Sequence, residues 1–404
     1  MENNLVDITD AKFKADPFSF YKSIRAGAGV CQAKPTRLGQ PWLVTRYADV
    51  SALLKDNRLA KNPANALSPE QLARLRIPKM FAPLMRNMLS QDDPVHARLK
   101  KLVQSAFTPK RVEQLVANTK TISNGLLNQI SVRSTFDLIE DYALPLPVIV
   151  ISELLGVPKA DRNRFAHWSR ILIRNSTVPW KMILSLPQII LFMRYLRHLV
   201  EMKRAEPDDA LVSALVAAES EGEKLSPDEL LGMIAILLTA GHETTTNLIG
   251  NGTLTLLQNP EALSRIKTEP SIIDSAIEEI LRHSGPVETA SERYAIEEIE
   301  IAGTRIPRGS LVFGVIASAN RDPLQFVDPD VLNLTRQPNR HLTFGEGGHY
   351  CVGAALARME GRVAFKDLFE RFPNLNLTAD SSKLKWRSGV ILRGLDHLPL
   401  NTKA

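Results

Sequence analysis

The sequence predicts a mainly α-helical protein with a minor β region. Apolar residues recur at helical spacing through most of residues 95–283, and short alternating segments near residues 42 and 300 predict strands. Prolines and glycines are spread along the chain and do not gather into a linker. With 404 residues and 44% hydrophobic content, the chain can bury a large core. We therefore expect a single domain spanning residues 1–404.

The strand signals lie near both ends of the chain. Residues 41–45 predict a short strand, and residues 47–54 then take helical spacing. Residues 298–301 alternate, turn at 302–303 and continue through 304–306 to 311–313. We expect these last segments to form one small antiparallel hairpin system.

The longest helix is expected from residue 227 to about residue 258. Ser226 offers an N-cap, Pro227 suits the first helical position, and Glu229 completes a capping box. The following residues, 230–238, are almost wholly apolar, so this helix should be buried on most sides. At about 1.5 Å per residue it is a rod of roughly 50 Å, long enough to cross the molecule.

Composition favours a cytoplasmic enzyme. The only cysteines, Cys31 and Cys351, exclude a disulfide framework and fit a reducing compartment. The polar, acidic N-terminus lacks the features of a signal peptide. The most apolar stretch, residues 182–193, is interrupted by Pro187 and Gln188 and is shorter than the roughly 20 residues that span a bilayer. We expect no membrane span.

A net charge of +6 and a pI near 9.2 raise the question of nucleic-acid binding. No basic run is interleaved with aromatic residues, so we do not expect it. Two interpretations of the densest basic cluster stay open: a solvated helix face, or a docking surface for an acidic protein. This cluster comprises Arg98, Lys100, Lys101, Lys110 and Arg111.

Cys351 stands in a glycine-rich run, residues 344–353. Gly345, Gly347 and Gly353 lack the Cβ atom that would hold the backbone away from a flat ligand. Helical spacing from residue 354 to 372 places Cys351 near a helix N-terminus, which favours thiolate over thiol. A thiolate in a glycine-rich pocket is the ligand that haem iron needs when electron density is pushed toward dioxygen.

Two alternatives for Cys351 are weaker. It could be a small buried residue beside a turn, as many free cysteines are. It could also be the nucleophile of a cysteine hydrolase, because His349 lies two residues away. Nucleophile and base normally come from separate parts of the chain, however, and no oxyanion loop is recognisable.

A second motif, residues 240–246, lies in the middle of the long helix. A glycine and polar side chains are costly in a buried helix. The threonines could bond back to carbonyls one turn earlier at a kink. Alternatively, the kink is part of a notch that binds oxygen.

Together these motifs resemble the cytochrome P-450 superfamily, and the resemblance runs from about residue 15 to the C-terminus. The cysteine run resembles its haem-binding loop, and residues 240–244 resemble its Ala/Gly-Gly-x-Asp/Glu-Thr pattern. The resemblance implies the triangular, helix-rich P-450 fold with the long helix over the haem. It also implies that Cys351 is the iron ligand, that Thr244 lies beside bound dioxygen, and that Glu243 belongs to the proton path.

The resemblance further implies a set of residues that bind haem b, iron protoporphyrin IX. The propionates would be held by His96, Lys100, Arg293 and His349. The remaining contacts would come from Phe344, Gly345, Gly353, Ala240 and Gly241. Lys100 departs from the family, which has arginine there, so its contact should be weaker or through water. His341 could be a further donor, although a structural role is the simpler interpretation.

The family's buried ion-pair frame is represented by Glu279, Arg282 and Arg336, whose role would be structural.

The function that the resemblance implies is that of a soluble, bacterial-type haem-thiolate monooxygenase. It would hydroxylate or epoxidise a hydrophobic molecule in secondary-metabolite, fatty-acid, terpenoid or steroid metabolism. A ferredoxin or flavodoxin with its NAD(P)H reductase would supply electrons, and we expect a monomer. The alternatives are a peroxide-driven hydroxylase and a non-catalytic haem sensor or carrier, and the intact Glu243–Thr244 pair argues against both.

Two apolar segments, residues 80–89 and 182–193, predict an adaptable substrate pocket rich in methionine. Ordinary core packing is the alternative interpretation. If the segments line the pocket, Phe81 and Ile189 should contact the substrate, with Glu288 or Thr289 as polar anchors.

Overall fold

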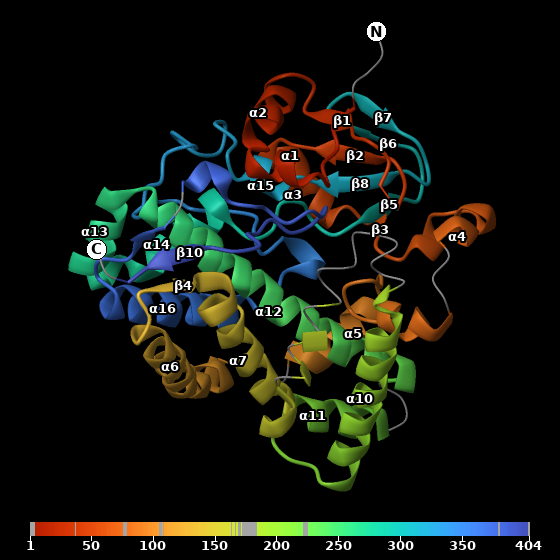
Figure 1. Cartoon of the computed structure of the whole chain (residues 1–404). Helices are drawn as coiled ribbons and strands as arrows, with labels where there is room; N and C mark the ends of the chain where they lie inside the picture. The colour runs from red at the N-terminus through yellow and green to blue at the C-terminus, as the bar shows by residue number, and fades with distance from the viewer. Residues whose placement is uncertain are drawn as a thin grey trace.

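Helix α12, Pro227–Leu257, crosses the molecule, and most other helices are arranged around it (Figure 1). The computed structural model describes residues 5–402 except 37, 76–78, 105–106, 108, 163, 166, 169–170, 172–183, 221–224 and 379. The predicted start of α12 is confirmed. The Ser226 hydroxyl accepts from the Glu229 N–H at 3.3 Å, and the Glu229 carboxylate accepts from the Ser226 N–H at 2.8 Å. These two bonds satisfy N–H groups that a helix start leaves unpaired.

The second half of α12 packs into a large hydrophobic cluster with helices on several sides. Leu248, Ile249, Leu254 and Leu256 of α12 belong to this cluster. The helices that share it are α6 (Pro109–Ser131), α7 (Pro145–Leu155), α14 (Ile273–Ser284) and α16 (Ala354–Arg371). A Cβ atom on Gly252 would lie 2.5 Å from the Phe365 ring, so this glycine lets α12 and α16 approach closely.

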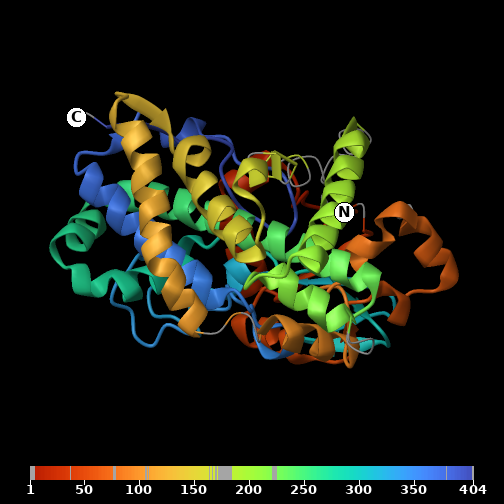
Figure 2. The ribbon, with the colours of Figure 1, turned by 90° about the horizontal axis from the view of Figure 1, so that it is seen from below.

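The first half of α12 packs into a second cluster with a different set of helices. These are α5 (Val95–Gln104), α10 (Leu186–Ala205) and α11 (Leu211–Ser220), together with the end of α7, which belongs to both clusters. Figure 2 shows α6 and α10 on opposite sides of the molecule. None of the described helices is both long and apolar enough to cross a membrane.

The largest sheet joins segments from both ends of the chain in the order β1-β2-β8-β5-β3. Its strands are β1 (Val30–Gln32), β2 (Pro41–Val44), β8 (Leu311–Gly314), β5 (Arg293–Ala295) and β3 (Leu59–Ala60). The β2–β8 pair is parallel and the other pairs are antiparallel.

The hairpin predicted from residue 298 is correct only in its first part. Strands β6 (Ile299–Ile301) and β7 (Thr304–Ile306) pair antiparallel. Strand β8 does not continue this hairpin but lies between β2 and β5. Every residue of β8 is buried, and such a strand is stable only between two neighbours and under cover on both faces.

A second sheet was not predicted from the sequence. It pairs β4 (Thr135–Asp137) with β10 (Pro399–Asn401), which in turn pairs with β9 (Asn376–Leu377). Because these strands have two or three residues, they show no alternating pattern, and β4 lies within the stretch predicted as helical.

The remaining described elements are short helices. They are α1 (Ala11–Ala15), α2 (Phe18–Ala26), α3 (Tyr47–Lys55), α4 (Pro69–Leu75), α13 (Pro260–Thr268) and α15 (Ile316–Ala319), with 3₁₀- or π-helical segments η1 (Pro63–Asn65), η2 (Lys79–Met85), η3 (Ile139–Ala143), η4 (Lys159–Asp161), η5 (Pro270–Ile272), η6 (Gly347–His349) and η7 (Ser381–Lys383).

Candidate functional site

The cysteine loop folds back on itself just before α16. The Cys351 N–H donates to the Phe344 carbonyl at 2.9 Å, and the Gly345 N–H donates to the Leu342 carbonyl at 2.8 Å. Gly345 and Gly347 have φ values of 71° and 73°, which strain any residue with a side chain. Gly353 caps α16, and Cys351 is exposed to solvent. The loop therefore presents an accessible thiol at the approach to a helix N-terminus.

The groups around Cys351 shift the pKa of its thiol in opposite directions. Desolvation by the protein atoms around the accessible sulfur raises the pKa of Cys351, whereas the Gly353 N–H and the charges of Lys100 and Arg358 lower it, and the net direction is upward. The preference for thiolate expected from the helix N-terminus is thus not provided by the protein groups alone. A bound metal cation would provide it, because it deprotonates a coordinating thiol.

Four predicted cofactor contacts converge near this loop. The His96 and His349 rings stack with centroids 3.9 Å apart, and His96 Nδ1 lies 2.9 Å from the Asp93 carboxylate. The Arg293 guanidinium donates to the Leu54 carbonyl at 3.0 Å, and its Nε has no partner among the described residues. Lys100 donates to the Tyr350 carbonyl at 3.0 Å and to the Gly348 carbonyl. Lys100 thus braces the cysteine loop itself.

The region around His349 is strongly positive. Burial lowers the pKa of His349, and the charges of His96, Lys61, Arg293 and Lys100 lower it further, to about 2. Within the described part of the chain, none of Lys61, Lys100 and Arg293 forms an ion pair with a carboxylate. An anionic ligand would therefore be favoured here. Lys61 was not predicted as a site residue. The only feature of the sequence that could have indicated it is its position directly after a buried strand.

Helix α12 is accessible on one narrow face in the middle of its buried length. Ile236, Ala240 and Thr244 are four residues apart, so they lie on one side of the helix, and each is at least partly exposed. The residues from 245 to 256 are all buried. Val352, next to Cys351, packs against the hydrophobic cluster to which the first half of α12 belongs. The end of the cysteine loop and the first half of α12 therefore share one cluster.

Two threonine hydroxyls of α12 bond back to carbonyls one turn earlier, as the first of the two interpretations predicts. The Thr244 hydroxyl donates to the Ala240 carbonyl at 2.9 Å, and Thr246 donates to the His242 carbonyl at the same distance. The predicted kink is accompanied by no break in helical structure. Packing explains the glycine at position 241, because a Cβ atom there would lie 3.0 Å from the Ile151 side chain of α7.

Glu243 is held by a residue that the sequence analysis missed. Its buried carboxylate, 4% exposed, forms an ion pair with Arg387, which also donates to the Asn247 side chain. Arg387 is itself anchored by a backbone bond to the Gly394 carbonyl at 2.9 Å. Because Arg387 lies far along the chain in an irregular segment, no local pattern predicts this pair.

Glu360 is a second carboxyl that the sequence analysis missed. It is fully buried on α16, and neither oxygen has a hydrogen-bond partner among the described residues. Burial raises the pKa of Glu360 to about 8, and the nearby Thr245 hydroxyl offsets this only in part. The carboxyl is therefore held mainly protonated at neutral pH, beside the polar stretch of α12.

Replacing Glu360 by glutamine should stabilise the fold in a pH-dependent way. The folded-state pKa of about 8 exceeds the ordinary value of 4.5, so the cost of keeping this group neutral is absent below about pH 4 and grows as pH rises toward 8. We expect Glu360→Gln to raise the free energy of unfolding by up to about 3 kcal/mol at pH 7 and to change it little at pH 4. Urea unfolding at both pH values measures this difference.

The exposed Glu370 of α16, changed to glutamine, is the control for this prediction, and its effect on stability should not depend on pH in this way. Equal effects of Glu360→Gln on the free energy of unfolding at both pH values would contradict the raised pKa of the buried Glu360 carboxyl.

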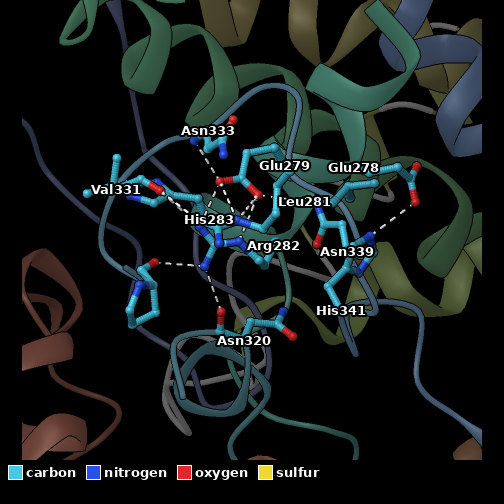
Figure 3. Close-up of polar contacts among 12 residues, drawn as sticks. Glu278, Glu279, Leu281, Arg282, His283, Asn320, Val331, Asn333, Asn339 and His341 are labelled. Carbon is cyan, nitrogen blue, oxygen red and sulfur yellow. Dashed lines mark hydrogen bonds and ion pairs between the residues drawn. The ribbon is translucent and has the colours of Figure 1, made fainter. Parts of the chain in front are cut away.

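The predicted ion pairs of Glu279 with Arg282 and Arg336 are present, and Figure 3 shows the Glu279–Arg282 pair. The Glu279 carboxylate accepts two bonds of 2.8 Å from Arg282 and bonds of 3.1 and 3.2 Å from Arg336. Arg282 also donates to the Asn320 carbonyl at 2.8 Å. The Asn320 side chain in turn accepts from the Leu342 N–H at 2.8 Å. This frame therefore connects α14 to the start of the cysteine loop.

His341 has the structural role that was the simpler interpretation. Its Nε2 lies 3.2 Å from the Glu278 carboxylate, and its Nδ1 accepts from the Thr343 N–H at 3.3 Å. Glu278 also accepts from Arg358 at 2.7 Å, and the Arg358 guanidinium lies over the Phe344 ring at 4.4 Å. Burial would raise the pKa of Glu278, but the bonds from Arg358 and His341 outweigh it and lower the pKa to about 2.

A hollow of about 620 Å³ lies beside this cluster. It is lined mainly by charged and polar side chains, of which Glu278 pairs with Arg358 and Asp274 pairs with Arg362. These mutually paired charges make it unsuited to an apolar substrate.

The predicted polar anchors for substrate, Glu288 and Thr289, are wrong. Both are fully buried. Glu288 forms an ion pair with Lys14 at 2.8 Å and accepts from the Tyr21 hydroxyl at 2.6 Å, while Thr289 donates to the Val390 carbonyl at 3.1 Å. Their polar atoms thus join the N-terminal and C-terminal segments and are not available to a ligand.

The two apolar segments are partly described. Ile189, Phe192 and Met193 are buried in the cluster around the first half of α12, and Leu84 and Met88 pack against it. This is the core-packing alternative for those residues. The side chain of Phe81 and residues 182–183 lie outside the described residues.

Comparisons with known proteins agree on one family. A family model described as Cytochrome P450 matches residues 128–393. The polyketide biosynthesis cytochrome P450 PksS of Bacillus subtilis (strain 168) is 40% identical over 393 residues, covering 96% of each chain. The 6-deoxyerythronolide B hydroxylase of Saccharopolyspora erythraea is 40% identical over 405 residues, covering 98% of each. Among solved structures, the myxobacterial cytochrome P450 CYP267B1 in complex with myristic acid superposes with a TM-score of 0.93 at 38% identity, covering 98% of this chain and 99% of that one.

Proposed function

Because this chain belongs to the cytochrome P450 family and is a haem-thiolate monooxygenase, we propose that Cys351 is the iron ligand of a haem b group lying between the cysteine loop and α12. The observation that carries this proposal is the exposed Cys351 in the glycine-rich loop, whose next residue, Val352, packs against the hydrophobic cluster of the first half of α12. The predicted fold, with the long helix across the molecule, is confirmed by the structural likeness to CYP267B1.

The residues present fit this cofactor. Phe344, Gly345 and Gly353 would contact it on the cysteine side, and Ala240 and Gly241 on the α12 side. His96, Lys100, Arg293 and His349 would hold the propionates. The unpartnered Nε of buried Arg293 and the strongly positive surroundings of His349 support this assignment. The bonds from Lys100 to two loop carbonyls favour the weaker contact expected of lysine at that position.

When bound, the haem supplies the binding and reductive activation of dioxygen. The protein must deliver two protons to the distal side of the site and exclude bulk water. The Thr244 hydroxyl, on the accessible face of α12, would release the Ala240 carbonyl to hold a water there. Glu243 would pass protons toward it after leaving Arg387, with which its carboxylate forms an ion pair.

For the substrate, we propose a bulky or long hydrophobic molecule of secondary metabolism. The names of PksS and 6-deoxyerythronolide B hydroxylase support a polyketide-type substrate, and the myristic acid complex of CYP267B1 supports a long acyl chain. A screen of both classes for the ligand-induced spin-state change of the haem tests this proposal. The proposal would be refuted if the protein bound small charged compounds tightly and bound neither polyketide-type molecules nor long acyl chains.

Replacing Thr244 by alanine should uncouple reductant consumption from product formation. The variant loses the hydroxyl on the accessible face, so we expect haem content and substrate binding to stay unchanged while NAD(P)H consumption is diverted to hydrogen peroxide. Peroxide and product yields per NAD(P)H measure this. Thr246→Ala is the matched control, since Thr246 makes the same bond one turn back but is buried. Unchanged coupling in Thr244→Ala would remove Thr244 from the proton path.

We further propose that a ferredoxin or flavodoxin docks at the predicted basic cluster and that the enzyme is a monomer. Lys101 of α5 is exposed and thus available for docking, whereas Arg98 bonds to the Glu229 carboxylate at 2.5 Å. The side chains of Lys110 and Arg111 lie outside the described residues.

Charge reversal at Lys101 should slow reduction by an acidic ferredoxin at low salt. Surface charges act mainly on association and are screened within about 8 Å at physiological ionic strength. Stopped-flow reduction of Lys101→Glu at low and high salt measures the effect, with the exposed Lys383→Glu as control. A defect that does not depend on salt would favour the solvated helix face.

A further inference from the structure

Lys61 is a buried lysine placed opposite Arg293. Lys61 directly follows β3 in the sequence, and the residue is only 4% exposed. Strands β3 and β5 pair antiparallel with Ala60 opposite Tyr294, so the next step of this ladder brings Lys61 and Arg293 together. The charge of Lys61 also acts on the His349 imidazole. Lys61 therefore shares the region of the proposed propionate contacts.

The ammonium group of Lys61 lacks an anionic partner. It donates to the Glu292 carbonyl at 2.8 Å and to the Ser291 hydroxyl, which leaves one of its three donors. The nearby Asp92 carboxylate is occupied by the backbone N–H groups of residues 61 and 62, at 2.6 and 3.1 Å, and by the Asn65 side chain at 2.7 Å. No ion pair to Lys61 occurs among the described residues.

The electrostatic balance at Lys61 agrees with this geometry. Burial lowers the pKa of Lys61 to about 7, and the charges of Glu292 and Asp92 offset the loss only in part, while Arg293 adds to it. A buried cation without a partner is costly, and a neighbouring guanidinium increases the cost. An anion bound between Lys61 and Arg293 would remove this cost.

We propose that Lys61 is a further cofactor-binding residue, whose ammonium donates to a haem propionate next to Arg293. This inference rests on the proposed haem b site. Lys61 and Arg293 come from adjacent strands, so they would fix one carboxylate from two sides. Asp92, which binds the backbone after β3 and whose carbonyl accepts from the His96 N–H at 2.9 Å, would hold Lys61 in register with the His96 side of the site.

The test compares holoenzymes carrying Lys61→Met and Lys61→Arg. Loss of a positive charge beside the propionates should move the haem reduction potential to more negative values. It should also speed haem transfer to apomyoglobin by about tenfold, the loss expected for one bond to a charged group. Lys61→Arg should restore both properties, and the exposed Lys383→Met should change neither. A folded Lys61→Met enzyme with unchanged potential and transfer rate would overturn the inference.

Reconstitution with the dimethyl ester of the haem separates a direct contact from a structural role. The ester lacks the carboxylate charges, so wild type and Lys61→Met should then transfer haem at equal rates. A difference in transfer rate that persists with the ester would also overturn the inference. Lys61→Met should retain the absorption band of the thiolate-ligated carbon monoxide complex, because Lys61 does not bind the iron. If the wild type itself lacked this band, the proposed iron ligand would be refuted, and not the role of Lys61.

Discussion

Replacing Cys351 by serine should abolish the absorption band at about 450 nm that a thiolate-ligated haem shows in its reduced carbon monoxide complex. A serine hydroxyl is neither as easily ionised nor as strong an electron donor as a thiolate. Substitution of residues that merely support a metal ligand typically costs 10–100-fold, so loss of the ligand itself should reduce substrate-dependent NAD(P)H consumption by more than about a hundredfold.

The chain offers a matched control for this change. Cys31, in β1, is the other cysteine and is half-buried in a strand. Cys31→Ser should keep both the band and the turnover, because only its packing changes. Retention of the band in Cys351→Ser would exclude Cys351 as the ligand. Loss of the band in Cys31→Ser would show that the measurement reports general damage to the fold.

Replacing Glu279 by alanine should destabilise the protein by about 3–5 kcal/mol, the usual cost of breaking a buried ion pair. The change leaves the Arg282 guanidinium, which is fully buried, without its carboxylate, and removes two further bonds from Arg336. Chemical denaturation followed by circular dichroism measures the free energy of unfolding. Because this frame leads to the cysteine loop through Asn320, we also expect weaker haem retention.

Glu278, the neighbouring residue on α14, is the control for this change. Its carboxylate is about 28% exposed and pairs with the partly exposed Arg358. Because Glu278 and Arg358 both keep contact with water, Glu278→Ala leaves no fully buried charge unpaired and should cost less than Glu279→Ala. Equal costs for the two variants would show that burial of the ion pair does not set the stability of this region.

The sequence predicted those parts of the fold and site that have a local pattern. The capping box of α12, the glycine-rich loop before α16 and the Glu279–Arg282 spacing each depend on residues a few positions apart. Local patterns of this kind can be recognised without knowing the tertiary structure.

The residues that were missed depend on contacts distant in sequence. Arg387 reaches Glu243 from 144 residues away, and Lys61 reaches Arg293 only through strand pairing. Glu360 occupies a buried helix face where the period predicts an apolar residue. Glu288 and Thr289 were misassigned because their partners are distant in sequence: Lys14 and Tyr21 for Glu288, and Val390 for Thr289.

The order of the five-stranded sheet also has a consequence for biosynthesis. Strand β2 can pair early with β1, but its other edge pairs with β8, and β3 pairs with β5, so these partners are missing until residues 293–314 have left the ribosome. Cys351 emerges later still. The other edge of β2 and strand β3 therefore stay unpaired until residues 293–314 have emerged. Since Cys351 is the proposed iron ligand, cofactor uptake through this ligand must come after the five-stranded sheet has all its strands.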